Sequence, residues 1–164
     1  MFRKSLYLLG IIIPTLFFSS YANAEVDAEV AYILNTFSFL VCGFLVMWMA
    51  AGFLFLESGL VTTRSVSTIA AKNIGKFAIV SIVFYLFGYN LGYGVDEGGI
   101  LGFPSLWTDN TSIDTGYSDA SDWFFQALFV CATVSIVSGA VAERIKIWPF
   151  FVFAAILGGF IYPI

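Results

Sequence analysis

The segment from Val30 to Leu56 contains no charged residue, and this feature constrains the fold of the chain more than any other. An α-helix rises about 1.5 Å per residue, so roughly 20 apolar residues cross the hydrocarbon core of a bilayer. With 60% hydrophobic and only 11% charged residues, the chain is more apolar than a soluble domain. We therefore predict an all-α, polytopic membrane helical bundle, with spans at about residues 30–56, 73–94, 123–142 and 147–164.

The N-terminal apolar segment has the features of a secretory signal. A basic start precedes an apolar run from Leu6 to Phe18, which is short of the roughly 20 residues that cross a bilayer core. Ala22-Asn23-Ala24 supplies the small residues of a signal peptidase site. We expect residues 1–24 to be a cleaved signal peptide and residues 25–164 to form the membrane domain; an uncleaved first helix is the alternative.

The charges between the spans predict the orientation of the chain. Arg64, Lys72 and Lys76 lie around the first connection, and Arg144 and Lys146 lie in the third. Cytoplasmic loops carry an excess of Lys and Arg, so both connections are expected inside. The mature N-terminus is then outside, in the periplasm of a bacterial-type inner membrane. The acidic connection from Val95 to Asp122, which has no Lys or Arg, is either a plain solvated loop or a region that concentrates cations.

Phe125 and Phe129 are candidates for a gate or a substrate-binding site. They are four residues apart, so their rings lie on one face of the third span. A phenyl face attracts a small cation, and two rings in series block water. In a chain with 19 phenylalanines, the usual role of such a pair is packing against lipid or core. Gln126 either contacts a ligand or hydrogen-bonds a neighbouring helix.

Glu57 is an acid at the edge of an apolar span, where carboxylates are functional suspects. With Arg64 downstream, it is expected to anchor the helix end through interfacial water or a basic partner. Cys42 and Cys131 lie in apolar stretches and are expected to be buried hydrophobes. Small residues at four-residue spacing predict close helix packing: Gly88 with Gly92, Ser135 with Gly139, Ala154 with Gly158, and Ala155 with Gly159.

The chain contains no histidine, which excludes imidazole metal sites, a Ser-His-Asp triad and a histidine proton relay within these residues. Its net charge of -4 is spread over loops that face different compartments. We expect no enzyme activity, no cofactor or metal, and no nucleic-acid partner.

Two sets of motifs together resemble a known family. The run from Phe125-Gln126-Ala127 to Thr133, followed by Gly139-Ala140-Val141-Ala142-Glu143-Arg144-Ile145, looks like the third span of ammonium transporters of the Amt/Mep/Rh family. Glu57-Ser58-Gly59-Leu60-Val61 and Lys72-Asn73 are similar to the first cytoplasmic loop of that family. The resemblance implies an inverted-repeat fold of roughly eleven helices, assembled as a homotrimer, of which this chain supplies the first four.

The resemblance also implies a substrate and a site. Ammonium is expected to bind at an outer vestibule above two stacked phenylalanines, which match Phe125 and Phe129 residue for residue, and to cross as ammonia. The family's vestibule Trp, buried Asp and two pore His fall beyond Ile164, so we expect the chain to be an N-terminal fragment that does not conduct alone. An ammonium sensor coupled to signalling and a structural membrane fragment are the alternatives.

Overall fold

The computed structural model describes residues 26–95 and 99–164, and every regular element within these ranges is helical. This confirms the predicted all-α fold. The predicted signal peptide, residues 1–24, lies outside the described residues. The helices are α2 (Ala28–Leu60), α3 (Val66–Val83), α4 (Tyr89–Tyr93), α5 (Asp119–Ala140) and α6 (Ile147–Ile156), and the short segments are η2 (Thr63–Ser65), η3 (Phe84–Gly88), η4 (Ile113–Thr115) and η5 (Leu157–Ile161).

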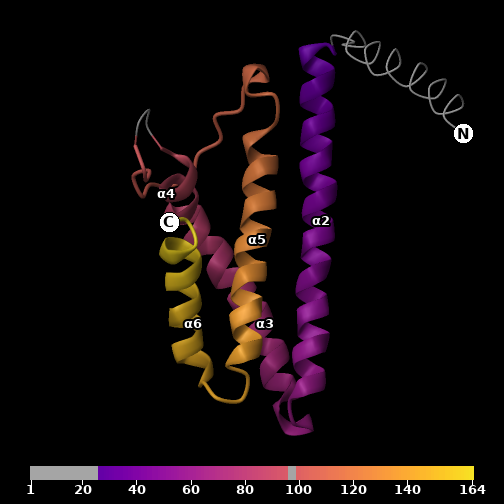
Figure 1. Ribbon diagram of the computed structural model, residues 1–164, viewed down its shortest axis with the longest axis vertical. Helices are drawn as coiled ribbons and strands as arrows, with labels where there is room; N and C mark the ends of the chain where they lie inside the picture. The colour runs from indigo at the N-terminus through magenta and orange to yellow at the C-terminus, as the bar shows by residue number, and fades with distance from the viewer. Residues whose placement is uncertain (1–25, 96–98) are drawn as a thin grey trace, which may run out of the picture.

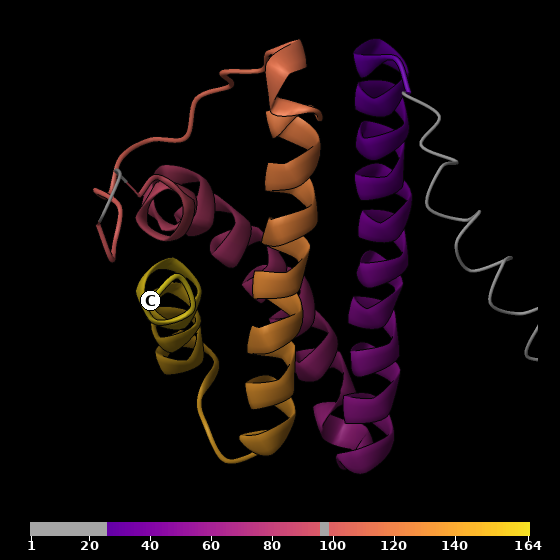
Figure 2. The ribbon, with the colours of Figure 1, turned by 45° about the horizontal axis from the view of Figure 1, so that its top comes forward.

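The helices form an elongated bundle. Figures 1 and 2 show α2 and α5 running side by side, with α6 on the other side of α5 and α3 crossing obliquely between them. We call the end with the starts of α2 and α5 the upper end, as in Figure 1, and the end where α2 and α5 finish the lower end. Three helical stretches are long and apolar enough to cross a membrane: Ala28–Leu60, Thr63–Tyr93 and Asp119–Ala140. The fourth apolar stretch, Ile147–Ile161, is shorter.

The second helix begins earlier than the sequence suggests. Its helical structure starts at Val66, after the 3₁₀ turn of η2, and not near Asn73. Lys72 and Lys76 therefore lie within a helix, where they are 4% and 1% exposed, and not in a cytoplasmic loop. The prediction that both lysines lie in a loop was therefore wrong. A lysine is tolerated inside an apolar helix only when its charge is compensated, and the compensating Glu57 lies on another helix, which the sequence of this segment does not reveal.

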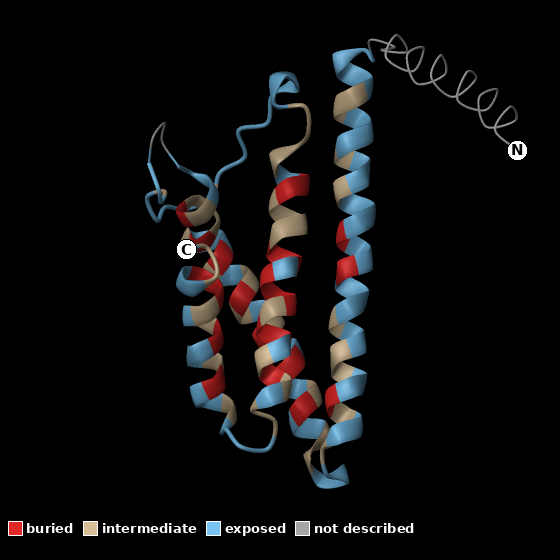
Figure 3. Cartoon of the chain, viewed as in Figure 1, coloured by how far each residue is buried: buried red, intermediate tan, exposed pale blue. Residues whose placement is uncertain are grey.

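The core lies between α3, α5 and α6. Val80, Val130, Val134, Phe150 and Ala154 have no exposed surface. Figure 3 shows buried residues concentrated on these three helices, while α2 is exposed along most of its length. In the most apolar stretch of α2, only 6% of the residues are buried, whereas 44% are buried in the corresponding stretch of α5. In a bilayer, this exposed apolar surface of α2 contacts lipid or other protein.

Glycines allow the two π-helical segments, η3 and η5, to pack closely. A Cβ atom on Gly88 would lie 3.3 Å from the carbonyl oxygens of Gly158 and Gly159. A Cβ atom on Gly159 would lie 2.2 Å from Cγ1 of Val83, closer than atoms can approach. These contacts confirm the predicted close packing at Gly88, Gly158 and Gly159.

The two cysteines differ in their surroundings. Cys131 is 1% exposed, and its Sγ lies 3.6 Å from the Ser81 hydroxyl oxygen. Cys42 is exposed on α2, so the prediction that it is buried was wrong. Its apolar neighbours in the sequence belong to α2, whose buried residues are Gly43, Val46 and Glu57.

Candidate functional site

Phe125 and Phe129 lie on one face of α5, as their spacing predicts. Their ring centroids are 4.9 Å apart and their planes are inclined by 75°, an edge-to-face arrangement. Phe39 of α2 packs against Phe125 with centroids 5.4 Å apart, and Tyr117 packs against Phe39 at 5.1 Å. The pair therefore belongs to an aromatic cluster between α2 and α5 near the upper end. Phe129 is 36% exposed, so one ring remains accessible.

Gln126 is tied to a carboxylate on its own helix. Its Nε2 donates to Oδ1 of Asp122 at 3.3 Å, and the Tyr89 hydroxyl donates to Oδ2 of Asp122 at 2.5 Å. The Phe125 ring thus packs against Phe39 of α2, whereas Asp122 contacts Tyr89 of α4 and Gln126. Asp122, which is 7% exposed, was read from the sequence only as a residue of the acidic loop. The Asp122–Gln126 spacing of four residues was the available signal for this contact.

A buried charge cluster joins three helices at the lower end. Oε2 of Glu57 lies 3.1 Å from Nζ of Lys72, and Oε1 lies 3.8 Å from Nζ of Lys76. Oε2 also accepts hydrogen bonds from Ser138 Oγ at 2.9 Å and from Asn73 Nδ2 at 3.5 Å. Glu57 is 2% exposed, so these contacts are shielded from solvent.

This cluster refines the sequence-based hypothesis for Glu57. Its partners are Lys72 and Lys76, and no ion pair joins it to Arg64 among the described residues. Two ammonium groups face one carboxylate, so the cluster carries an excess positive charge. Lys72 also donates to the Ser138 carbonyl at 3.1 Å and lies 5.0 Å from the centroid of the Phe150 ring, which distributes its charge over polar and aromatic partners. The arrangement fastens α2, α3 and α5 together.

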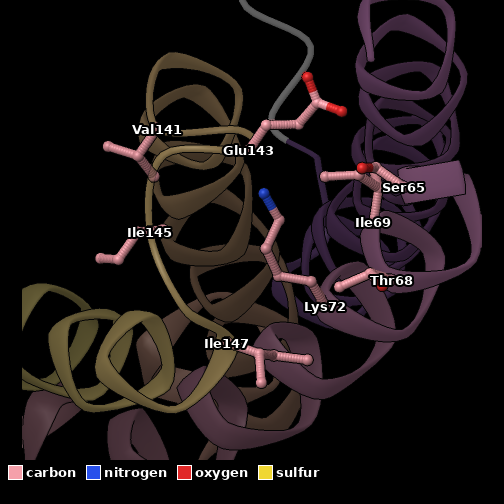
Figure 4. Close-up of a pocket in the computed structure, with 8 residues that line it drawn as sticks. All are labelled: Ser65, Thr68, Ile69, Lys72, Val141, Glu143, Ile145 and Ile147. Atoms are coloured by element: carbon pink, nitrogen blue, oxygen red, sulfur yellow. The ribbon is translucent and has the colours of Figure 1, made fainter. Parts of the chain in front are cut away.

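A small cavity of about 90 Å³ adjoins the cluster on the side of the turn after α5. Figure 4 shows Lys72 extending from α3 into this space, between Ser65 and Thr68 on one side and the turn with Val141 and Glu143 on the other. The volume is enough for only a few water-sized groups. Lys72 already has the Glu57 carboxylate and the Ser138 carbonyl as partners, so the charge cluster accounts for its position without a substrate.

Glu143 links the two turns at the lower end. Its Oε1 accepts from the Thr62 amide at 3.0 Å and from the Thr62 hydroxyl at 2.6 Å. The hydrogen bond from the Thr62 side chain lowers the pKa of Glu143, because it stabilises the ionised form. Glu143 has a positive φ of 60°, the left-handed conformation that side-chain-bearing residues adopt rarely. The chain reverses here between α5 and α6.

Comparison with known proteins decides the family. The sequence model of the Ammonium Transporter Family matches residues 37–164, which include all of α3 to η5 and most of α2. The chain belongs to this family. Two ammonium transporters illustrate the similarity: Amt2 of Archaeoglobus fulgidus is 39% identical over 76% of this chain, and Amt1 of Methanocaldococcus jannaschii is 34% identical over 80% of it.

The similarity extends along nearly the whole chain. The Synechocystis protein sll1017 is 34% identical over 99% of the residues. The chain spans 38% of the length of that protein, 26% of Amt2 and 31% of Amt1. Membership of the ammonium transporter family, together with the three long apolar helices, makes the chain part of a multi-pass membrane protein. Phe125, Gln126 and Phe129 all lie within the matched region.

Proposed function

We propose that this chain contributes to the passage of ammonium or ammonia across a membrane, with Phe125 and Phe129 as the gate on the outer side. The observation that carries the proposal is the edge-to-face pair, with ring centroids 4.9 Å apart and one ring accessible, within the region that matches the family. The names of the relatives Amt2 and Amt1 support ammonium as the substrate. The alternatives, an ammonium sensor or a structural fragment, are not better supported.

The chemistry of the pair fits a cation that loses its charge before it crosses. A phenyl face attracts a small cation by about 0.5 to 2 kcal/mol, and more strongly when water is displaced. Carrying an ion through the centre of a bilayer costs several kcal/mol at least. A cation that binds at the rings and crosses as neutral ammonia avoids that cost. Gln126, held by Asp122 beside the pair, supplies a polar group at the same height of α5.

The surroundings of the gate are part of the proposal. The upper end of the bundle faces outward, in a bacterial-type inner membrane, and a signal peptide of residues 1–24 is removed to leave a membrane domain from residue 25. The longer protein assembles as a homotrimer in the lipid bilayer. The exposed apolar face of α2, with Phe37 63% and Trp48 78% exposed, is available for lipid or for a neighbouring subunit.

The test uses a chimera in which residues 1–164 replace the matching part of sll1017 of Synechocystis, which aligns with 99% of this chain. Uptake of radiolabelled methylammonium is measured in cells that produce this chimera, and in cells that produce a double variant of it with Phe125→Ala and Phe129→Ala. The matched control is Phe103→Ala, because Phe103 is 81% exposed in the loop before α5, outside the cluster. We expect the double variant to change uptake or its selectivity over other cations and the control to leave both unchanged. Equal methylammonium flux in the double variant and the parent would refute the gate.

A further inference from the structure

Two polar residues of α2 hold the turn that leads into α5, at the upper end where these helices lie side by side (Figure 1). Asn35 Nδ2 donates to the Gly116 carbonyl at 3.0 Å, and the Thr36 hydroxyl accepts from the Ser118 amide at 3.0 Å. Gly116 has a φ of 77°, the left-handed conformation that glycine adopts readily, so the chain can reverse here. The start of α5 is therefore tied to α2 on both sides of Tyr117.

The same turn of α2 carries the aromatic ring that packs between the two segments. Phe39 lies three residues after Thr36, and its ring centroid is 5.1 Å from that of Tyr117, with the planes inclined by 78°. On its other side, Phe39 lies 5.4 Å from the Phe125 ring, which lies 4.9 Å from the Phe129 ring. Four rings thus form a continuous row from Tyr117 to Phe129.

The position of Phe39 in this row suits it to restrain the gate. Phe125 and Phe129 belong to one helix, and each ring can turn about its side-chain bonds unless a neighbour prevents it. Phe39 is half-buried and reaches Phe125 from a different helix. Aromatic pairs have preferred orientations, and a site keeps its geometry only when packing locks the rotamers of its side chains. Phe39 supplies this packing for Phe125.

We propose that Phe39 is a positioning residue of the gate, which holds the Phe125 ring against Phe129 and does not itself touch the substrate. The hydrogen bonds of Asn35 and Thr36 keep α2 in the register that this role requires. The inference rests on the proposed function and deepens it, because it concerns how the gate rings are held.

The first experiment uses the chimera with sll1017 and measures the KM for radiolabelled methylammonium and its selectivity over the larger dimethylammonium. Phe39→Ala leaves a space into which the Phe125 ring can turn, so the gate should widen. We expect the selectivity to fall by about two- to tenfold, the equivalent of one aromatic pair. Phe39→Leu fills most of the space and should restore it, and Phe103→Ala, in the exposed loop, should match the parent.

This readout separates positioning from a general loss of structure. A smaller amount of folded protein lowers the maximal rate but leaves the KM and the selectivity unchanged. If Phe39 acts through Phe125, Phe39→Ala should have no further effect in a chimera that already carries Phe125→Ala. Parental KM and selectivity in Phe39→Ala, or the same effect of Phe39→Ala with and without Phe125→Ala, overturns the proposal.

The second experiment observes the ring without transport. Phe125 is replaced by para-fluorophenylalanine in the complete chain, purified in lipid nanodiscs, and its fluorine NMR signal is recorded. Phe39→Ala should shift the signal and change its width, whereas Phe103→Ala should leave it as in the parent. An unchanged signal in Phe39→Ala overturns the proposal. Should Phe39→Ala not fold by circular dichroism, Phe39→Val replaces it in both experiments with the same deciding outcomes.

The two proposals can fail separately. Parental uptake in the variant with Phe125→Ala and Phe129→Ala refutes the gate, and the fluorine signal then decides whether Phe39 positions the Phe125 ring. Altered uptake in that variant, with an unchanged fluorine signal in Phe39→Ala, keeps the gate and overturns the role of Phe39.

Discussion

Replacing Glu57 with Gln should strongly destabilise the bundle, because it removes the one negative charge in the buried cluster. Gln has nearly the same shape and retains an oxygen for the hydrogen bonds from Ser138 and Asn73. The substitution therefore isolates the charge. It leaves the ammonium groups of Lys72 and Lys76, which are 4% and 1% exposed, without a counter-ion.

The separations in the cluster set the size of the effect. With an effective dielectric constant of about 20, Coulomb's law gives ~5 kcal/mol of attraction at the 3.1 Å separation of Glu57 and Lys72, and ~4 kcal/mol at the 3.8 Å separation of Glu57 and Lys76. These gross energies are reduced by desolvation, by repulsion between the lysines and by relaxation in the variant. Removing one partner of a buried pair costs about 3 to 5 kcal/mol, and we expect Glu57→Gln to lower the free energy of unfolding by that amount.

The assay is reversible unfolding of the purified chain in mixed micelles, with the helical signal followed as denaturing detergent is added. Glu29→Gln is the control for charge removal, since Glu29 is exposed in the first turn of α2, and its effect should stay within about 0.5 kcal/mol. A triple variant, Glu57→Leu with Lys72→Met and Lys76→Leu, removes all three charges and should recover most of the lost stability. A Glu57→Gln variant as stable as the parent would show that the lysines need no buried counter-ion and would refute the reasoning.

Three further perturbations test neighbouring parts of the structure. Lys76→Met removes the excess positive charge of the cluster and should leave the same unfolding free energy unchanged or higher; a loss above about 2 kcal/mol would contradict this. Gly159→Ala places a Cβ atom 2.2 Å from Val83 and should cost about 1 to 3 kcal/mol, with recovery when Val83→Ala is added; no recovery would refute the contact. The pKa of Glu143 is lowered from its ordinary value of 4.5, so its contact with Thr62 should be fully formed above pH 4.5. The contact should be lost as the pH falls through the lower pKa that Glu143 has in the folded chain. Protection of the Thr62 amide from hydrogen exchange should follow that loss, whereas Glu143→Gln should remove the pH dependence.

The sequence predicts the features that depend on local periodicity. Long uncharged segments locate the helices, and small residues at four-residue spacing locate the contact of η3 with η5. The spacing of Phe125 and Phe129 likewise places both rings on one face of α5. Each of these features depends on residues that are neighbours on one helix, so a single sequence contains the information.

The features that the sequence does not predict depend on pairing between distant residues. Lys72 and Lys76 read as the boundary of a span because their counter-ion, Glu57, is on another helix. Asp122 reads as part of a solvated loop because its partner Tyr89 is 33 positions away. In both cases a charged or polar side chain is buried only because a specific partner offsets the cost of removing it from water. Hydropathy along the chain contains no information about that partner.

The two polar contacts together determine how α5 is oriented. Near its upper end, Asp122 accepts from Tyr89 of α4, and near its lower end, Ser138 donates to Glu57 of α2. A rotation of α5 by one residue turns every side chain by about 100° and would break both contacts. Phe125 and Phe129 lie between these two points, so the same contacts keep the Phe125 ring against Phe39 and the Phe129 ring beside Phe125. Loss of the charge at Glu57 should therefore affect the gate as well as stability, through the orientation of α5 and without any contact between Glu57 and the rings.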